Sequence, residues 1–103
     1  MGLDLWLYHV EPTRNGKHLA TTDQDGLYLF ESSTSNRRFI SEIEMDYQNG
    51  STDIVENMPF YYRPINMDAA IAWAKKNFPN EERAINTLLK MKENPCLWLQ
   101  EDQ

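Results

Sequence analysis

The sequence predicts an α+β domain built on a mainly antiparallel sheet of four to six strands, with two helices on one face. Strand-like alternation dominates the first two thirds of the chain, two amphipathic helical segments follow, and an apolar run near the end returns to the strand pattern. The 103 residues suit one compact domain over 1–103.

The first predicted strand carries large apolar or aromatic groups on both faces. Successive side chains of a strand point to opposite sides, which gives Leu3, Leu5 and Leu7 on one face and Trp6, Tyr8 and Val10 on the other. A strand with two apolar faces is typical of the interior of a sheet. We expect helices on one face and other protein, such as a partner chain, on the second.

Turn-forming residues punctuate the next segment. Pro12 and Asn15-Gly16 predict that residues 11–17 reverse the chain into a hairpin. Short strands are expected at 18–22 and 27–31. A polar turn at 23–26 follows the first of them, and a polar loop at 32–36 follows the second.

Residues 39–47 alternate between apolar and charged side chains and are predicted to form a strand. Asn49-Gly50 is a hairpin signal that would join this strand to 52–55, although Asp46 would then lie opposite Asp53 and repel it. A helix remains the alternative, because helical spacing also relates Phe39, Ile40, Ile43 and Tyr47.

The C-terminal part predicts two helices and a final strand. Asn66 and Asn80 are suitable N-caps for helices over 67–77 and 80–92. Both helices have one apolar stripe, so they are expected to cover the same face of the sheet. The last strand, 96–100, is expected beside the first.

Motifs of the common enzyme classes are absent from the sequence, which indicates a protein that is not an enzyme and needs no cofactor or metal. An alternative is a small enzyme or ligand-binding domain in which His9 and His18 face each other across the first hairpin. The segment 23–26 resembles a fragment of a calcium loop but lacks the remaining ligands. A turn is the expected structure there.

Cellular context is indicated by the single cysteine and the N-terminus. Cys96 is alone, so no internal disulfide can form and a reducing, cytoplasmic location is expected. The first residues include Asp4 and lack a basic leader region, so neither a secretory signal nor a membrane segment is predicted.

Negative charge is concentrated in the first part of the chain. Residues 1–62 contain ten acidic and four basic residues, which accounts for the whole net charge of −6. On a strand over 39–47, Glu42, Glu44 and Asp46 would project from one face about 6.6 Å apart. Such a row repels nucleic acid and attracts basic proteins, with Asp53 and Glu56 adding to the field; a solvated outer face is the alternative.

Aromatic residues provide candidate anchors for a protein partner. Tyr61 and Tyr62 stand beside Arg63, and Tyr and Arg are enriched at binding hot spots. Trp73 lies off the apolar stripe of its helix, where it either packs at an edge or is exposed as an anchor. Packing within the sheet is the alternative for the tyrosines.

The opening residues, Met1 to Tyr8, resemble the start of small bacteriophage and prophage proteins that begin MGLD followed by an apolar and an aromatic residue. Leu5 differs from the methionine that is common in those proteins. Tyr61-Tyr62-Arg63, followed by Trp73 on a helix, is a second and looser resemblance. The resemblance to these proteins implies a phage or bacterial context and assigns no activity or functional residue.

We therefore expect a non-enzymatic protein-binding module, an acidic phage-type inhibitor of a basic host protein. The related alternative is an immunity protein against a toxic nuclease. A homodimer assembled through the first strand is the structural alternative.

Overall fold

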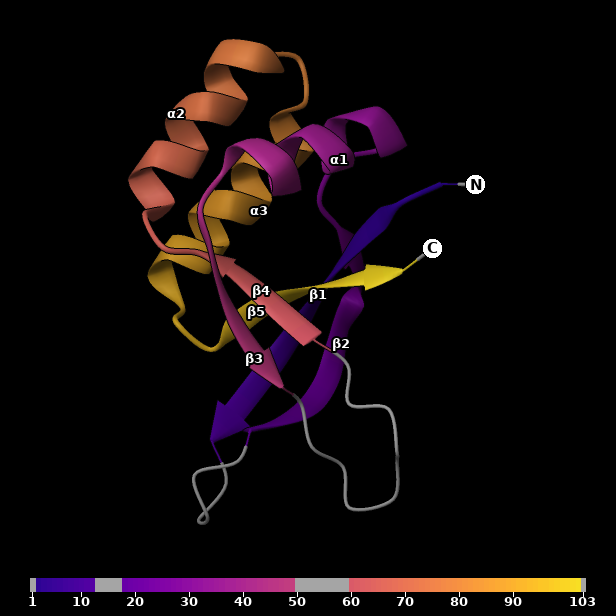
Figure 1. Cartoon of the computed structure of the whole chain (residues 1–103), viewed down its shortest axis with the longest axis vertical. Coiled ribbons are helices and arrows are strands. Elements are labelled where there is room, and N and C mark those ends of the chain that lie inside the picture. Colours follow the sequence, from indigo (N-terminus) through magenta and orange to yellow (C-terminus); the bar gives the residue numbers. More distant parts are fainter. Residues whose placement is uncertain (1, 13–17, 50–59, 103) are drawn as a thin grey trace.

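The computed structural model describes residues 2–12, 18–49 and 60–102, and it confirms an α+β fold with an antiparallel sheet. The helices pack on one face of this sheet, where their apolar side chains meet those of the strands (Figure 1). The described elements are β1 (Asp4–Pro12), β2 (His18–Tyr28), α1 (Ser33–Glu42), β3 (Met45–Asn49), β4 (Phe60–Pro64), α2 (Met67–Asn77), α3 (Glu82–Glu93) and β5 (Leu97–Asp102).

The described strands form one sheet in the order β2-β1-β5-β4-β3, with every neighbouring pair antiparallel. The first strand lies in the interior of the sheet, as its two apolar faces predict. The last strand pairs beside it, also as predicted, and extends two residues beyond the expected end at residue 100. β2 and β3 form the two edges.

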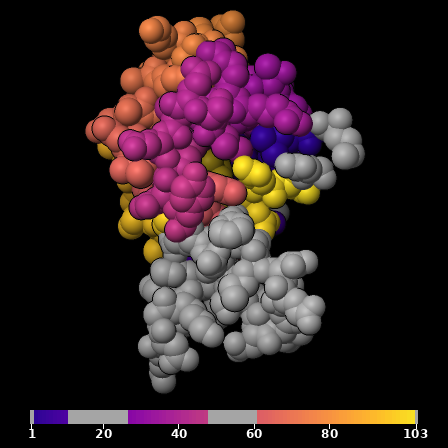
Figure 2. All heavy atoms as spheres, in the orientation of Figure 1, coloured from indigo at the N-terminus to yellow at the C-terminus, as the bar shows by residue number. Residues whose placement is uncertain are grey.

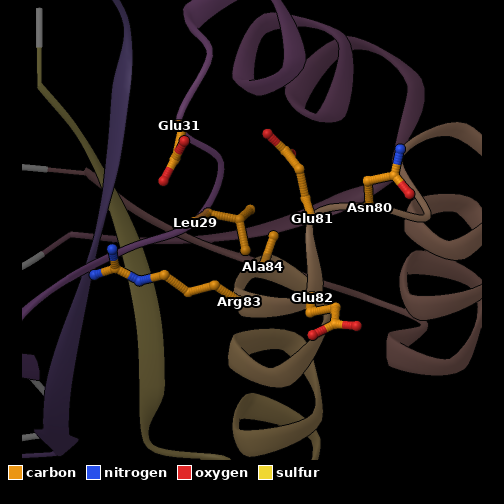
Figure 3. Close-up of a pocket in the computed structure, with 7 residues that line it drawn as sticks. All are labelled: Leu29, Glu31, Asn80, Glu81, Glu82, Arg83 and Ala84. Atoms are coloured by element: carbon orange, nitrogen blue, oxygen red, sulfur yellow. The ribbon is translucent and has the colours of Figure 1, made fainter.

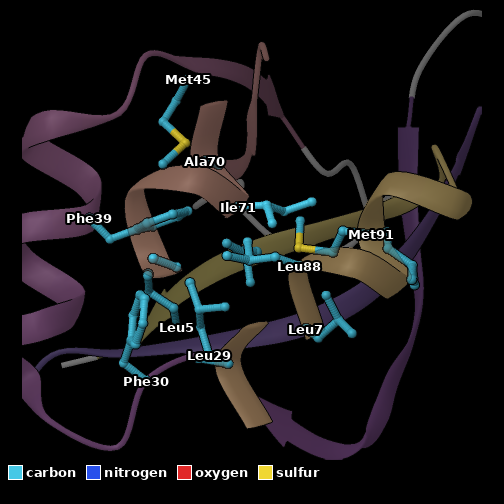
Figure 4. Close-up of a cluster of buried hydrophobic side chains, with 14 residues drawn as sticks. Leu5, Leu7, Leu29, Phe30, Phe39, Met45, Ala70, Ile71, Leu88 and Met91 are labelled. Atoms are coloured by element: carbon cyan, nitrogen blue, oxygen red, sulfur yellow. The ribbon is translucent and has the colours of Figure 1, made fainter. Parts of the chain in front are cut away.

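The two faces of β1 contribute to separate apolar clusters. Leu5 and Leu7 are at most 1% exposed and lie in the main core with residues of all three helices (Figure 4). On the opposite face, Val10 packs with Tyr61 and Trp98, all three at most 8% exposed. This part of the second face is thus buried without a partner chain.

The strand predicted over 39–47 is wrong, because α1 ends at Glu42 and β3 begins at Met45. The expected loop 32–36 instead contains the first turn of α1. Asn36, which is fully buried, accepts a hydrogen bond from the Phe30 N–H (3.1 Å) and donates to the carbonyls of Leu3 (2.9 Å) and Phe30 (3.1 Å). The bond to Leu3, which is 33 residues away in the sequence, fixes the start of α1 against the chain just before β1.

β2 replaces the two short strands and the turn predicted between them. Trp6 pairs with Tyr28 and Tyr8 with Asp23, so two steps along β1 correspond to five along β2. Extra residues in one strand of a pair form a bulge and bend the strand. The turn-forming segment 23–26 therefore interrupts the register without ending the strand.

The partner of β3 also differs from the prediction. Met45 pairs with Pro64 and Asn49 with Phe60, so β4 takes the place that the sequence assigned to 52–55. The predicted strand 52–55 and the residues of the turn at 13–17 lie outside the described residues.

The helices of the C-terminal part are confirmed. α2 has the predicted bounds, and the Asn66 side chain caps it by accepting a hydrogen bond from the Ala69 N–H (3.0 Å). α3 begins later than predicted, with Glu81 rather than Asn80 at the N-cap position, because residues 79–80 form a turn after Phe78. Of the helices in the described ranges, none is long and apolar enough to cross a membrane.

The Arg63 guanidinium connects β4 to the end of α3 and the start of β5. It donates hydrogen bonds to the carbonyls of Met91 (2.6 Å), Asn94 (3.1 Å) and Leu97 (2.8 Å). Its partial burial lowers the pKa of Arg63. Since orphan carbonyls at a helix end need donors, Arg63 acts as a side-chain cap for α3.

We predict that Leu7→Ala lowers the free energy of unfolding by about 2–5 kcal/mol, because it leaves a cavity in a closely packed core. Chemical denaturation measures this change. Leu89→Ala is the matched control, since Leu89 is 39% exposed and should lose less than about 1 kcal/mol. Equal losses in the two variants would contradict the assignment of Leu7 to the core.

We predict that Arg63→Met lowers the free energy of unfolding by about 2–3 kcal/mol, because three partly buried carbonyls lose a charged donor. Arg83→Met serves as the control: the Arg83 guanidinium lies over the Tyr28 ring at 4.0 Å, and an exposed contact of this kind contributes about 0.5–1 kcal/mol. Urea unfolding compares the two. A loss at Arg63 no larger than that at Arg83 would show that the three bonds do not stabilise the fold.

Candidate protein-binding surface

The predicted acidic row does not lie on one strand face. Glu42 is the last residue of α1, where its carboxylate accepts hydrogen bonds from Arg38 Nε (2.8 Å) and Trp73 Nε1 (3.4 Å). These bonds, Arg38 first, hold the pKa of Glu42 below its ordinary value. Glu42 is thus occupied in joining α1 to α2.

All three carboxylates of the row are exposed, and two of them lie at β3. Glu44 precedes β3 and Asp46 lies within it, and both are exposed. Asp53 and Glu56 lie outside the described residues. The predicted row is reduced to a pair of acids at the edge of the sheet.

Trp73 packs inside an aromatic cluster. Its ring meets Phe30, Phe39 and Phe78 with centroids 5.5–6.1 Å apart, and the Arg38 guanidinium lies 5.6 Å from its centroid. Aromatic pairs in this geometry stabilise the packing of α1 against α2. Trp73 therefore takes the packed position that the sequence analysis gave as one of its two alternatives.

The two predicted tyrosine anchors point to opposite faces of β4. Tyr61 is 2% exposed and meets the Tyr8 ring edge-on at 5.8 Å. Burial and, to a smaller extent, Tyr8 raise the pKa of Tyr61. Tyr61 is part of the second apolar cluster and does not face a partner.

Tyr62 is half-buried on the helix side of the sheet, where it supports an exposed neighbour. The Tyr47 ring lies edge-on to it, with centroids 5.1 Å apart and an interplanar angle of 77°. Burial, then the charge of Glu101, then Tyr47 raise the pKa of Tyr62. Tyr47 itself is 65% exposed.

We name this region the β3 edge surface and define it by Glu44, Asp46, Tyr47, Tyr62 and Glu101. Tyr47 is a candidate binding residue that sequence reasoning missed. The available signal was an aromatic residue in a short strand close to Asn49-Gly50, but only the sheet order shows that this strand is an edge. The surface combines an exposed aromatic ring with negative charge.

A broad groove of about 500 Å³ adjoins the β3 edge surface between α1 and the ends of β1 and β5. Its lining includes Leu3, Arg37, Ile40 and Glu101. Figure 2 shows the molecule hollowed between α1 and the yellow end of β5. Glu101 lines this groove and is also close enough to Tyr62 to raise its pKa.

A second, smaller pocket of about 210 Å³ lies at the beginning of α3 (Figure 3). Glu81 lines it, and no described residue forms a hydrogen bond with the buried Oε2 of this side chain. Burial and the nearby Glu31 carboxylate raise the pKa of Glu81, although a hydrogen bond from the Glu31 backbone opposes the shift.

A carboxyl with a raised pKa suits a general acid, but the described lining of this pocket offers little else for catalysis. The lining residues with described placement are Leu29, Glu31, Asn80, Glu81, Glu82, Arg83 and Ala84, which include neither a histidine nor a nucleophile such as serine or cysteine. The residues with described placement contain no group of three metal-ligating side chains.

The proposed pair of histidines is not supported by the sheet register. His9 pairs with Thr22, and His18 pairs with Pro12. His18 therefore lies opposite a position on β1 that is three residues beyond His9, a distance of about 10 Å along the strand. This register contradicts the expectation that they face each other across the hairpin.

We predict that Glu81→Gln raises the melting temperature at pH 7. A raised pKa means that the folded protein binds more protons than the unfolded chain above pH 4.5, the ordinary value, so Glu81 costs stability as pH rises through its folded pKa. The gain should therefore shrink as pH falls through the folded pKa towards 4.5, and it should be largely lost below 4.5. Glu82→Gln, on an exposed neighbour in the same turn, should bring no gain, and a lower melting temperature of Glu81→Gln at pH 7 would contradict the assignment.

Comparisons of the chain with protein-family models, with curated proteins and with solved structures found no match.

Proposed function

We propose that this chain is a protein-binding module that binds a basic protein through the β3 edge surface. The observation that carries the proposal is Tyr47, which is 65% exposed at the edge of the sheet and held by Tyr62, with exposed carboxylates beside it. Such a module suits a phage-type inhibitor of a basic host protein, the role that the sequence analysis favours.

The aromatic pair supplies the contact area of this surface. A tyrosine buries a large amphipathic surface and has few rotatable bonds, so it loses little conformational entropy when a partner covers it. The edge-on contact with Tyr62 restricts the Tyr47 ring further before binding. Pre-ordered aromatic anchors of this kind contribute most to affinity in protein interfaces.

The charges determine which partner the surface accepts. Glu44 and Asp46 are exposed beside Tyr47, Glu101 is close enough to raise the pKa of Tyr62, and the whole chain carries a net charge of −6. A field of this sign accelerates association with basic proteins and opposes contact with nucleic acid phosphates. A basic protein partner is therefore favoured over direct binding to nucleic acid.

The proposal is tested by immobilising the protein and capturing its partner from the cells in which the chain is made. We predict that the double variant Glu44→Gln/Asp46→Asn and the single variant Tyr47→Ala each weaken retention by about tenfold or more, as expected for the loss of about 1.4 kcal/mol. Neutralisation is preferred to charge reversal because Asp46 lies opposite Arg63 in the ladder, where a lysine would face another cation.

The matched control is Glu31→Gln/Glu82→Gln, which removes two exposed carboxylates beside the β2 edge, on the far side of the sheet from β3. This variant should retain the partner almost as well as the wild type. Equal retention by the Glu44/Asp46 variant and the wild type, or a wild type that retains no protein, would refute the proposal.

A further inference from the structure

We infer that the partner contributes an extended segment that adds as a new strand to the edge of β3 that no described strand pairs with, and that basic and apolar side chains alternate along this segment. The inference rests on the proposed function and names the chemistry of the partner. Addition of a strand to a sheet edge is a recurrent mode of peptide recognition, in which main-chain hydrogen bonds provide affinity and alternate side chains provide specificity.

The register identifies the backbone groups at this edge. The Ile65 N–H donates to the Glu44 carbonyl (3.0 Å), and the β3–β4 ladder then continues without a shift. In an antiparallel pair, hydrogen-bonded and non-hydrogen-bonded residues alternate. Asp46 and Gln48 therefore direct their N–H and C=O groups to β4, whereas Met45, Tyr47 and Asn49 direct theirs outward.

The side chains of β3 specify the pattern of the added strand. Tyr47 lies on the helix side with Tyr62, and strand alternation places Asp46 on the other side. Glu44 and Asp46 are separated by two residues, about 6.6 Å along the chain. An added strand would therefore meet an aromatic pair on one face, where apolar side chains fit, and carboxylates on the other, where lysine or arginine fits.

The two edges of the sheet differ in their readiness for such pairing. Natural edge strands are commonly protected by bulges, lysine or proline. The register of β2 is irregular, and Arg83 of α3 reaches the Tyr28 ring at the end of this strand. β3 pairs with β4 over all five of its residues without a shift in register. β3 is therefore the edge that suits strand addition.

The charge on the chain favours a basic segment over a second copy. Self-association through β3 would bring together two chains that each carry a net charge of −6, with the carboxylates of Asp46 and Glu44 beside the interface. Like charges at an interface disfavour association, whereas opposite charges steer it. The expected occupant is thus a cationic extended peptide.

The test uses a capped synthetic peptide of about six alternating lysine and valine residues, the usual length of a strand, with hydrogen exchange of individual amides followed by NMR. Binding should slow the exchange of the Tyr47 and Asn49 amides by about tenfold or more, since each gains a hydrogen bond worth about 1.4 kcal/mol in the bound state. The Asp46 amide should change little, because β4 already bonds it.

Two controls separate strand addition from simple surface binding. A peptide methylated on alternate backbone nitrogens keeps its side chains and charge but should bind at least about tenfold more weakly. In the protein, Tyr47→Pro removes the outward N–H that Tyr47→Ala retains, and neither change removes a donor to β4. Tyr47→Pro should therefore bind the peptide more weakly than Tyr47→Ala, while circular dichroism checks that both variants fold.

Unchanged exchange at Tyr47 in the bound state, equal binding of the methylated peptide, or no binding of either peptide would overturn the inference. Protection of Tyr47 that appears without peptide as the protein concentration rises would overturn it in favour of self-association. In each of these cases, loss of the captured partner from Glu44→Gln/Asp46→Asn would still support the proposed function, so the two failures are distinguishable.

Discussion

The attachment of the β3–β4 hairpin to the rest of the sheet depends on Arg63. The ladder between β4 and β5 contains only two described residue pairs, Tyr61 with Gln100 and Tyr62 with Leu99. Beside them, one guanidinium donates to three carbonyls at the end of α3 and the start of β5. This cluster sets the position of β4 relative to α3, and β4 in turn sets the position of β3. The orientation of the exposed edge therefore depends on partly buried hydrogen bonds of Arg63.

The division between core and surface follows from how far the helices extend over the sheet. The main core joins the leucines of β1, β2 and β5 to all three helices (Figure 4). At the β3 edge this cover is incomplete, because Met45 is 7% exposed whereas Tyr47, two residues further along the same face, is 65% exposed. A strand that enters the core at one end and leaves it at the other presents an aromatic ring next to solvent. Protein interfaces commonly combine an apolar centre with a polar, solvent-accessible rim.

The sequence predicted correctly those elements that depend on neighbouring residues, such as a helix with its N-cap or a strand with alternating side chains. Asn66 and the apolar stripe behind it define α2, and the alternation of residues 3–10 defines an interior strand. The division of 33–49 into α1 and β3 could not be predicted in this way, because it depends on Asn36 bonding to Phe30 and to Leu3, which is 33 residues away in the sequence. The candidate site shows the same limit. Its charge was evident, but the exposure of Tyr47 and the burial of Tyr61 follow from sheet order and from the face on which each ring lies.

The central claim is that this chain binds a protein through the β3 edge surface. The most direct test is to map which residues of the isotope-labelled chain are affected when the captured partner binds. Chemical-shift mapping of the complex should place the largest changes at Asp46, Tyr47 and Tyr62, with smaller changes across the adjoining groove lined by Ile40. Residues around Glu81, at the opposite edge of the sheet, should be unaffected. A footprint centred on the Glu81 pocket, with the signals of Tyr47 and Asp46 unchanged, would contradict the account.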